Sequence, residues 1–327
     1  MFNATSIIDS KLYYCNGTDI NVPPKYTIGI VYFMLGFVAQ IAYLLVLKTF
    51  WQDATFWNHA CYRIMFFLGI PDILSLLICA EAAGIWSIYG LHPCHNMELS
   101  YFLGCFVFGT WHMSCAYVLI LAFNRSCELI APNVGRILFS GKPLFVILCL
   151  PIANFVYFTF FTKPLIYDPT KSTFLLNPNT ERTKFFGPDT YAVYGFIFNN
   201  FFVIIFIFIN YFTVCTFLIY HSFITKMQKV SKLYRQVTVQ CTVVCCCHFV
   251  GCFLYIYMQY VEIPQIFHII AQLAWIGNHG LPPFVYLIFN STIKSKVSLC
   301  YHKPPNSTIV KLSSTPNGNK KPGINVL

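Results

Sequence analysis

Long apolar stretches constrain this chain more than any other feature of its sequence. A helix rises about 1.5 Å per residue, so roughly 20 apolar residues span the hydrocarbon core of a bilayer, which is about 30 Å thick. Backbone groups in lipid must find hydrogen-bond partners within the segment, which favours a helix for each stretch. Seven stretches predict membrane-spanning helices, at about residues 27–48, 64–88, 99–123, 143–162, 191–220, 236–261 and 263–289.

The composition agrees with a membrane protein. Hydrophobic residues make up 57% of the chain and charged residues only 10%, and the mean hydropathy is +0.62. A soluble domain of this length has more charge and less apolar content. We therefore predict an all-α membrane protein whose residues 27–289 form a bundle of seven transmembrane helices.

The distribution of basic residues predicts the orientation. With seven spans, fifteen Lys and Arg residues lie on the side of the C-terminus and six on the other side. Cytoplasmic segments carry the excess of Lys and Arg, so the N-terminal segment 1–26 is predicted to be extracellular and the C-terminus cytoplasmic. Segment 1–26 does not resemble a cleavable signal peptide, and its Asn3 and Asn16 are candidate glycosylation sites. The net charge of +10 is then mainly this cytoplasmic excess of basic residues, which faces anionic membrane lipid. No nucleic-acid partner is needed to explain it.

The segment after the last span has two predicted parts. Residues 290–303 form a candidate membrane-surface helix, in which Cys300 is a candidate for palmitoylation. Residues 304–327 are rich in Pro, Ser, Asn and Gly and are predicted to be a disordered cytoplasmic tail.

Two of the fifteen cysteines are predicted to face the oxidising side. Cys15 and Cys94 either form a disulfide or are two free or partly buried thiols. The run Cys245–Cys247 before His248 resembles a metal motif. Adjacent helical residues point about 100° apart, however, so the run predicts packing rather than a metal site. No metal and no cofactor are predicted.

Two carboxylates lie within the second span. A buried charge is costly in lipid and indicates function, and Asp72 would be protonated, solvated or bound to a cation, with Asn278 as a plausible partner. Glu81 lies about 13.5 Å further along the helix. It is predicted to lie near the outer mouth of the bundle, where it either contacts a cationic ligand or is hydrated.

The third span ends at Asn124 and Arg125. An arginine at a helix end can reach interfacial water, so Arg125 is either a cytoplasmic anchor or a working residue that pairs at rest and meets a partner protein on activation. Asn124 offers no carboxylate, and Glu128 is the substitute partner if the helix continues. A basic strip in the third cytoplasmic loop would contact lipid or a partner protein, or would simply be solvated; it consists of Lys226, Lys229, Lys232 and Arg235.

A small-molecule pocket in such a bundle is expected between the outer halves of the helices. Candidate residues at that depth have aromatic or polar side chains, which are also common as packing residues and interface anchors. They are Glu81, Phe108, Trp111, His112, Gln259, His268 and Gln272.

Several motifs resemble those of rhodopsin-like G-protein-coupled receptors. Asn124-Arg125-Ser126 is similar to their Asp-Arg-Tyr signature, Pro283-Phe-Val-Tyr286 to their Asn-Pro-x-x-Tyr, and Asp72 to their aspartate in the second helix. The resemblance implies that Asn124, Arg125, Pro283 and Tyr286 act in activation and G-protein coupling. The chain also departs from that group, because 163–190 contains no cysteine and 236–261 contains neither Trp nor Pro.

A narrower resemblance covers about residues 13–296. YYCNG (13–17), CYRIMFFLGIPD (61–72), Cys94, Trp111 followed by LAFNR (121–125), and PPFVYLIFNSTIK (282–294) together resemble the nematode chemosensory receptors of serpentine class T. The resemblance implies a chemosensory receptor that binds a small molecule and signals to a heterotrimeric G protein. It also implies a place in the plasma membrane of a sensory neuron, in its cilium.

The same sequence bears on two other classes of function, enzymes and channels or transporters. No Walker loop, nucleophile elbow or His-Glu-x-x-His motif is present in the sequence, so an enzyme is not predicted. A ligand-gated channel or transporter that uses Asp72 and Glu81 is the alternative, because ion pathways also contain buried carboxylates. Transporters frequently contain internal repeats, and none is visible in the sequence.

Overall fold

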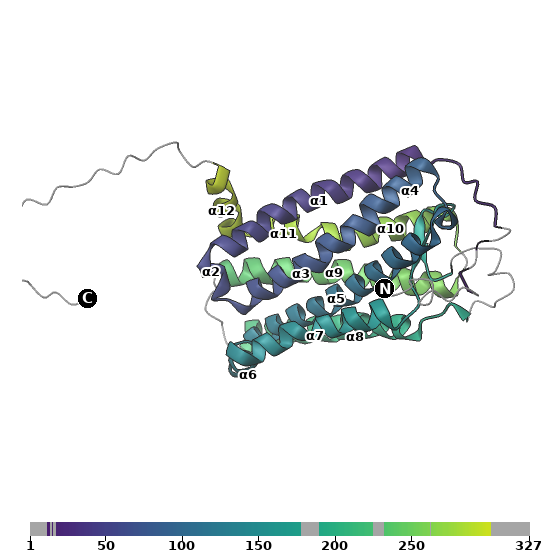
Figure 1. Ribbon diagram of the computed structural model, residues 1–327. Coiled ribbons are helices and arrows are strands. Elements are labelled where there is room, and N and C mark those ends of the chain that lie inside the picture. Colours follow the sequence, from purple (N-terminus) through teal and green to yellow (C-terminus); the bar gives the residue numbers. More distant parts are fainter. Residues whose placement is uncertain are drawn as a thin grey trace, which may run out of the picture.

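The computed structural model describes residues 12, 13, 15, 18–177, 190–224, 232–261 and 263–301. Long helices lie side by side and form one bundle, with the short elements gathered at its two ends (Figure 1). The long helices are α1 (Tyr26–Gln52), α3 (Ala60–Leu76), which continues through the π-helical turn η2 (Leu77–Ala82) into α4 (Ala83–Tyr89), α5 (Met97–Ile130), α7 (Gly141–Phe160), α8 (Tyr194–Ile224), α9 (Lys232–Tyr260) and α10 (Gln265–Gly280). The shorter elements are α2 (Ala54–Trp57), η3 (Pro93–His95), α6 (Pro132–Leu138), β1 (Ile166–Asp168), β2 (Thr173–Leu175), α11 (Pro282–Phe289) and α12 (Ser291–Tyr301).

Six helices among the described residues are long and apolar enough to cross a membrane, and each overlaps one of the predicted spans. They are Tyr26–Gln52, Ala60–Tyr89, Met97–Ile130, Gly141–Phe160, Tyr194–Phe217 and Thr238–Met258. Large apolar side chains on their outer faces are exposed in the structure, as on α8, where Phe198, Phe202, Phe208 and Phe212 point outward. Lipid is the solvent that suits such a surface.

The predicted seventh span is not one helix, and this prediction is corrected. The chain forms α10 and then α11, with a break at Leu281. Pro282 and Pro283 follow the break, and neither has an amide hydrogen to continue the helical ladder. Their rings also clash with carbonyls one turn back, so the helix ends and restarts there.

A β-hairpin closes one end of the bundle, which we call the hairpin end. Strands β1 and β2 pair antiparallel, with Asp168 opposite Thr173. In the turn between them, the Asp168 side chain accepts hydrogen bonds from the backbone and the hydroxyl of Thr170. The N-terminal segment lies at the same end, because Tyr191 donates to the Leu12 carbonyl at 3.1 Å and a disulfide joins Cys15 to Cys94 with 5.6 Å between their Cα atoms.

The connection between α7 and β1 lies directly against α5. A Cβ atom placed on Gly104 of α5 would be 2.0 Å from the Leu165 carbonyl oxygen. Only a glycine allows the backbone of the hairpin segment to approach a helix this closely. The position of the hairpin over the bundle therefore depends on this residue.

The opposite end holds α2, α6 and α12 (Figure 1). Asp53, which caps α2, forms an ion pair with Lys296 of α12 at 2.7 Å. The hydrogen bond from Lys296, followed by those from Thr55, lowers the pKa of Asp53 to about 2. The Asp53 carboxylate is therefore charged at neutral pH. The contribution of the ion pair to folding stability is present at neutral pH and is lost as the pH falls from the ordinary carboxyl pKa through about 2.

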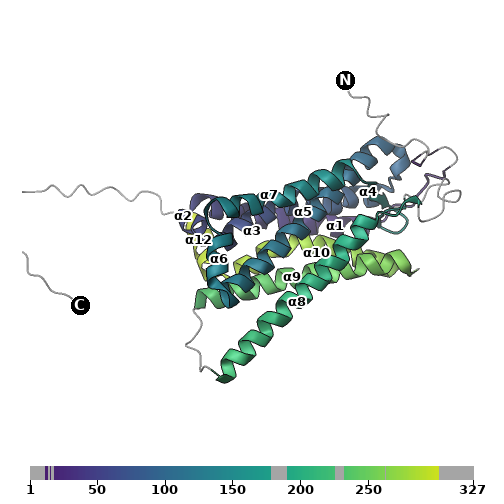
Figure 2. The ribbon, with the colours of Figure 1, turned by 90° about the horizontal axis from the view of Figure 1, so that it is seen from below.

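One helix stands away from the others at this opposite end. In the rotated view, α8 crosses the bundle and diverges from α9 toward its C-terminus (Figure 2). Near the divergence, Ser126 of α5 donates to Asn210 of α8 at 2.8 Å. The Asn210 amide in turn donates to the Ala122 carbonyl, so polar contacts hold α8 to α5 where the ends begin to separate.

Candidate functional site

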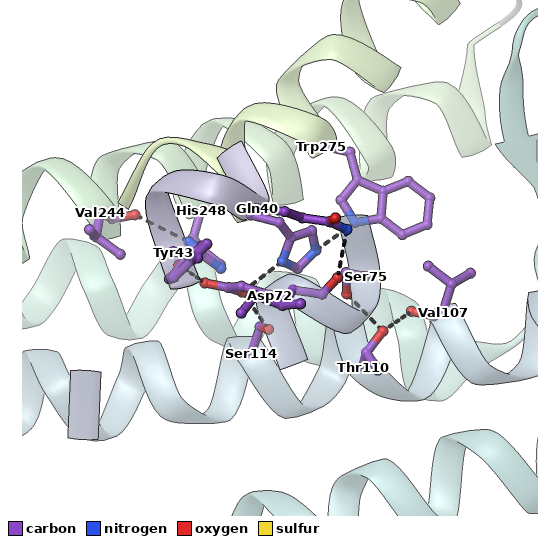
Figure 3. Close-up of polar contacts among 12 residues, drawn as sticks. Gln40, Tyr43, Asp72, Ser75, Val107, Thr110, Ser114, Val244, His248 and Trp275 are labelled. Atoms are coloured by element: carbon purple, nitrogen blue, oxygen red, sulfur yellow. Dashed lines mark hydrogen bonds and ion pairs between the residues drawn. The ribbon is translucent and has the colours of Figure 1, made fainter. Parts of the chain in front are cut away.

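The carboxylate of Asp72 is the centre of a polar cluster deep within the bundle (Figure 3). Tyr43 of α1 donates to Oδ2 at 2.5 Å, and Ser114 of α5 donates to Oδ1 at 2.9 Å. His279 of α10 is 2.7 Å from Oδ1 through its Nδ1. Three other helices thus contact one side chain of α3, and each donor offsets part of the cost of burying the carboxylate.

The tautomer of His279 follows from its second contact. Trp275, one turn earlier on α10, donates from Nε1 to His279 Nε2 at 2.9 Å. An indole nitrogen only donates, so Nε2 of His279 carries the lone pair and Nδ1 carries the proton that Asp72 accepts. The hydrogen bonds run in one direction, from Trp275 through His279 to Asp72.

The expected partnership between Asp72 and Asn278 is wrong. Asn278 is buried, but its amide lies against Gly251 of α9, where an added Cβ would be 1.9 Å from Nδ2. The next residue, His279, points to Asp72 instead. Adjacent helical residues differ by about 100° in direction, so the error of one position changes which helix a side chain faces.

Gln272 connects the polar cluster to the hairpin. Its Oε1 accepts from the Thr173 hydroxyl at 3.1 Å, from the Phe174 amide at 3.3 Å and from the Tyr255 hydroxyl at 3.3 Å. Its Nε2 donates to the Cys79 carbonyl at 2.7 Å. Gln272 lies one turn before Trp275 on α10, and Trp275 lies one turn before His279. Successive turns of one helix therefore carry the contact to the hairpin, the Trp275 ring and the contact to Asp72.

A small enclosed space lies under the hairpin. Its empty volume is about 160 Å³, and its walls leave no room for a water-sized sphere. The wall consists of Trp111, Leu165, Phe196, Tyr255 and Trp275. Four of these five side chains are aromatic, and the Trp275 ring packs edge-to-face against both Tyr255 and Trp111.

Only part of the predicted ligand set lies near this space. Trp111 lines it and Gln272 holds the hairpin above it, as described. Phe108 and His112 do not line the space but contact its wall residue Phe196, with ring centroids 5.3 and 5.9 Å away. Their other sides pack on α7, where the His112 ring stacks on Phe158. Glu81 lies against Gly36 of α1, and the Gln40 amide, in its hydrogen-bonding orientation, donates to the Glu81 carboxylate at 2.8 Å.

Two ligand candidates remain. His268, on the first turn of α10, is buried and contacts the Pro264 carbonyl at 3.4 Å. The side chain of Gln259 falls outside the part of the chain that is described.

Arg125 lies at the opposite end of the same bundle, on α5. The helix continues to Ile130, and Arg125 pairs with Glu128 at 2.5 Å, which confirms the predicted substitute partner. Arg125 also donates to the Asn124 side chain, and both Asn124 and Arg125 are buried. Asn124 therefore orients the Arg125 guanidinium, while Glu128 supplies the negative charge that pairs with it.

Tyr286 and Pro283 are buried in α11. The Tyr286 ring lies 6.3 Å from Phe50 of α1, which places it in the core near the opposite end. Four residues with predicted roles lie outside the described residues: Asn3, Asn16, Lys226 and Lys229. The side chains of Lys232, Arg235 and Cys300 are likewise outside the described part of the structure.

Several central residues were not among the sequence-based candidates. Tyr43, Ser114, Trp275 and His279 were all overlooked. The spacing of four between Trp275 and His279 places both on one helical face, and this was the available signal. No sequence pattern links Tyr43 or Ser114 to Asp72, because their contact depends on how α1, α3 and α5 pack.

Asp72 and Glu81 contact different partners within the described part of the bundle. Asp72 is enclosed by donors from three helices, and Glu81 faces α1 through Gln40. The described residues contain no cluster of three or more His, Cys, Asp or Glu side chains that could hold a metal. No observation on these residues favours the channel or transporter alternative.

The bundle with its apolar outer surface defines a multi-pass membrane protein. The model of the family described as serpentine type 7TM GPCR chemoreceptor Srt matches residues 1–308. The chain belongs to this family of chemosensory receptors, which is a receptor family and not an enzyme family. No curated protein matches the chain.

Proposed function

We propose that this protein is a G-protein-coupled receptor that binds a small molecule under the hairpin and relays a helix rearrangement to a heterotrimeric G protein. The observation that carries the proposal is the row of contacts along α10. Gln272 contacts the hairpin, Trp275 lines the enclosed space, and His279 contacts Asp72. One face of one helix thus joins an outer site to the centre of the bundle.

The proposed topology has seven crossings, with α10 and α11 together forming the seventh. The hairpin end then faces outward together with the N-terminal segment, and the end with α2, α6 and α12 faces the cytoplasm. The excess of Lys and Arg on that side supports the orientation. The disulfide between Cys15 and Cys94 supports it too, because such bonds persist in an oxidising compartment.

The relay begins with displacement of a ring. Because the enclosed space has no room for a water-sized sphere, a ligand must move at least one wall residue to enter. Rotation of Trp275 removes its hydrogen bond to His279. His279 is then free to change its contact with Asp72, the residue on which α1, α3, α5 and α10 converge.

The cytoplasmic end supplies the output. In the resting state, Glu128 and Asn124 hold Arg125. Release of Arg125 and an outward movement of α9 would open a surface for a G protein, with Pro283 and Tyr286 packed at the base of α11. The basic strip from Lys226 to Arg235 would face the same partner and the anionic lipid. From the membership of the family, we infer that this protein lies in the plasma membrane of a sensory neuron, in its cilium.

The test uses cells that express the full chain with a tag at each end. Compounds are screened for a second-messenger response that disappears when G-protein coupling is blocked. Arg125→Ala should abolish this response and leave surface delivery unchanged, whereas Arg136→Ala, an exposed arginine that contacts Asn133 in α6, should preserve it. A current that persists under the block, or two tags accessible from one side, would contradict the proposal.

A further inference from the structure

The walls of the enclosed space indicate the chemistry of the ligand. The polar atoms of the wall residues are already engaged within the protein. Trp111 donates to Asn200 at 3.2 Å, Trp275 to His279 at 2.9 Å and Tyr255 to Gln272 at 3.3 Å. A ligand with several polar groups would lose its hydrogen bonds to water here and gain few in return, which opposes binding.

The charged groups around the space are also engaged. Asp72 accepts from three donors, and Glu81 contacts Gln40. Lys25, at the start of α1, donates to the Thr170 carbonyl and the Ser172 hydroxyl of the hairpin. Within the described residues, no charged side chain is among those that line the space. An ionic ligand would therefore be buried without a counter-ion, which is far more costly than burial of a neutral group.

The arrangement of the rings does not suit an organic cation. A cation binds over an open aromatic face. His248 stacks on one face of Trp111, with 5.9 Å between the ring centroids. The Trp275 ring meets the rings of Tyr255 and Trp111 at interplanar angles of 77° and 84°. In these edge-to-face contacts the positive edge of one ring already occupies the negative face of another.

Two polar atoms beside Trp111 allow one hydrogen-bonding group. Asn200 accepts from Trp111, and its Nδ2 has no hydrogen-bond partner among the described residues. His248 stacks on Trp111 and contacts the Val244 carbonyl through Nδ1, so its Nε2 is an acceptor, and this atom likewise has no partner in the described part of the chain. Both side chains are fully buried. A ligand carbonyl can accept from Asn200, and a ligand hydroxyl can donate to His248.

We propose that the ligand is a small uncharged molecule with an aromatic or aliphatic body and a single carbonyl or hydroxyl group. This inference rests on the proposed function, because it assigns the ligand class of that site. The ligand displaces a wall ring, packs its apolar body among Trp111, Phe196, Tyr255 and Trp275, and directs its polar group to Asn200 or His248. Burial of apolar surface supplies most of the affinity.

The experiment compares compounds that share one skeleton and differ in charge. The purified receptor in lipid nanodiscs is incubated with neutral aldehydes, ketones and alcohols of up to about ten heavy atoms, and with the amine and carboxylate of each skeleton, such as benzaldehyde, benzyl alcohol, benzylamine and benzoate. Binding is measured as the shift of the thermal unfolding midpoint, and signalling as the second-messenger response of expressing cells. We expect at least one neutral compound to bind and signal, and its charged counterparts to be silent.

Two variants fill the space from different elements, so the test does not depend on one of them folding. Phe196→Trp on α8 and Leu165→Phe beside the hairpin should each weaken binding of the neutral compound by tenfold or more. Phe198→Trp is the matched control, because Phe198 is exposed on the same helix, and it should bind as the parent does. Binding by an amine or carboxylate in preference, no binding by any neutral compound, or unchanged binding in both filled variants would overturn the ligand class.

The two readouts separate this inference from the proposed function. A neutral compound that binds in the parent and not in the filled variants, yet gives no G-protein-dependent response, would keep the ligand class and contradict the receptor mechanism. A charged compound that gives a G-protein-dependent response would support the receptor mechanism and contradict the ligand class.

Discussion

His279 donates a hydrogen bond to Asp72 over 2.7 Å and thereby joins α10 to α3 in the middle of the bundle. Both side chains are fully buried. The contact matters because it is the inner end of the row that starts with Gln272 under the hairpin. Asp72 also binds Tyr43 and Ser114, so a change at His279 reaches two further helices through one carboxylate.

Removing either partner should destabilise the protein, and the two losses should not add. His279→Leu leaves Asp72 with one donor fewer, and Asp72→Asn leaves the His279 proton without its charged acceptor. Each change should cost about 1–3 kcal/mol, because a buried polar group is left unsatisfied. The double variant should lose less than the sum, as measured by unfolding of the purified protein in a double-mutant cycle.

Ser75→Ala provides the matched control for that cycle. Ser75 is buried on the same helix as Asp72 and donates to Thr110 of α5, so it shares no hydrogen-bond partner with His279. Its effect should add to that of His279→Leu within about 0.5 kcal/mol. Additivity in the Asp72 cycle as well would show that the two side chains are not coupled.

Glu128→Gln should raise signalling in the absence of ligand. The substitution removes the charge that holds Arg125 and leaves the contact with Asn124 in place. Arg125 is buried but the Glu128 side chain is 36% exposed, so water screens the pair and its contribution is about 0.2–1 kcal/mol. Basal second-messenger output should therefore rise by up to roughly fivefold. Glu98→Gln, at the first turn of the same helix, should leave the basal level unchanged. An equal rise in both variants would argue against the role of Glu128.

The spans were predictable because lipid imposes one requirement on all of them. Length and hydropathy placed six helices close to their observed bounds, such as Gly141–Phe160 for the predicted 143–162. The same criteria missed the break at Leu281, which depends on two adjacent prolines within an otherwise apolar stretch. Hydropathy measures transfer into lipid and does not register a missing amide hydrogen.

The candidate site was predictable only in part. The cost of a buried charge identified Asp72, and Arg125 was identified because it follows a long uncharged stretch. The expectation that Arg125 ends the helix and reaches interfacial water was wrong, because α5 continues to Ile130 and Arg125 is buried. The partners of Asp72 were not predictable, because Tyr43, Ser114 and His279 come from three separate helices whose rotations are set by packing. Glu81 was predicted near the outer mouth, either in contact with a cationic ligand or hydrated, and in the structure it contacts Gln40 of α1. Its direction depends on the π-helical turn Leu77–Ala82 that contains it, and hydrophobic periodicity does not predict such a turn.

Gly104→Ala should destabilise the hairpin end. The new Cβ would lie 2.0 Å from the Leu165 carbonyl oxygen, and the displacement needed to relieve the clash costs about 1–3 kcal/mol. Alanine is favoured over glycine in a helix by about 1 kcal/mol, so the clash must exceed this gain. Gly277→Ala on α10 is the control, because the nearest atom to its Cβ in the described part of the chain would be Leu281 Cδ1 at 3.6 Å. Thermal unfolding should show a loss for Gly104→Ala and no loss for Gly277→Ala; equal midpoints would contradict the close packing.

Oxidation should lock α9 against α3 through Cys61 and Cys241. Their sulfurs are 4.0 Å apart and both residues are buried toward the end of the bundle opposite the hairpin, so a modest movement brings them to the bonding distance of about 2 Å. Copper phenanthroline with oxygen removes two electrons and two protons from the pair and leaves a disulfide. If signalling requires α9 to move away from α3, the oxidised receptor should lose its response and a reductant should restore it. Cys61→Ala, which cannot form the bond, should keep the response under the same oxidant. A response that persists in the cross-linked protein, identified by cleavage between the helices on a non-reducing gel, would show that activation leaves these two helix ends together.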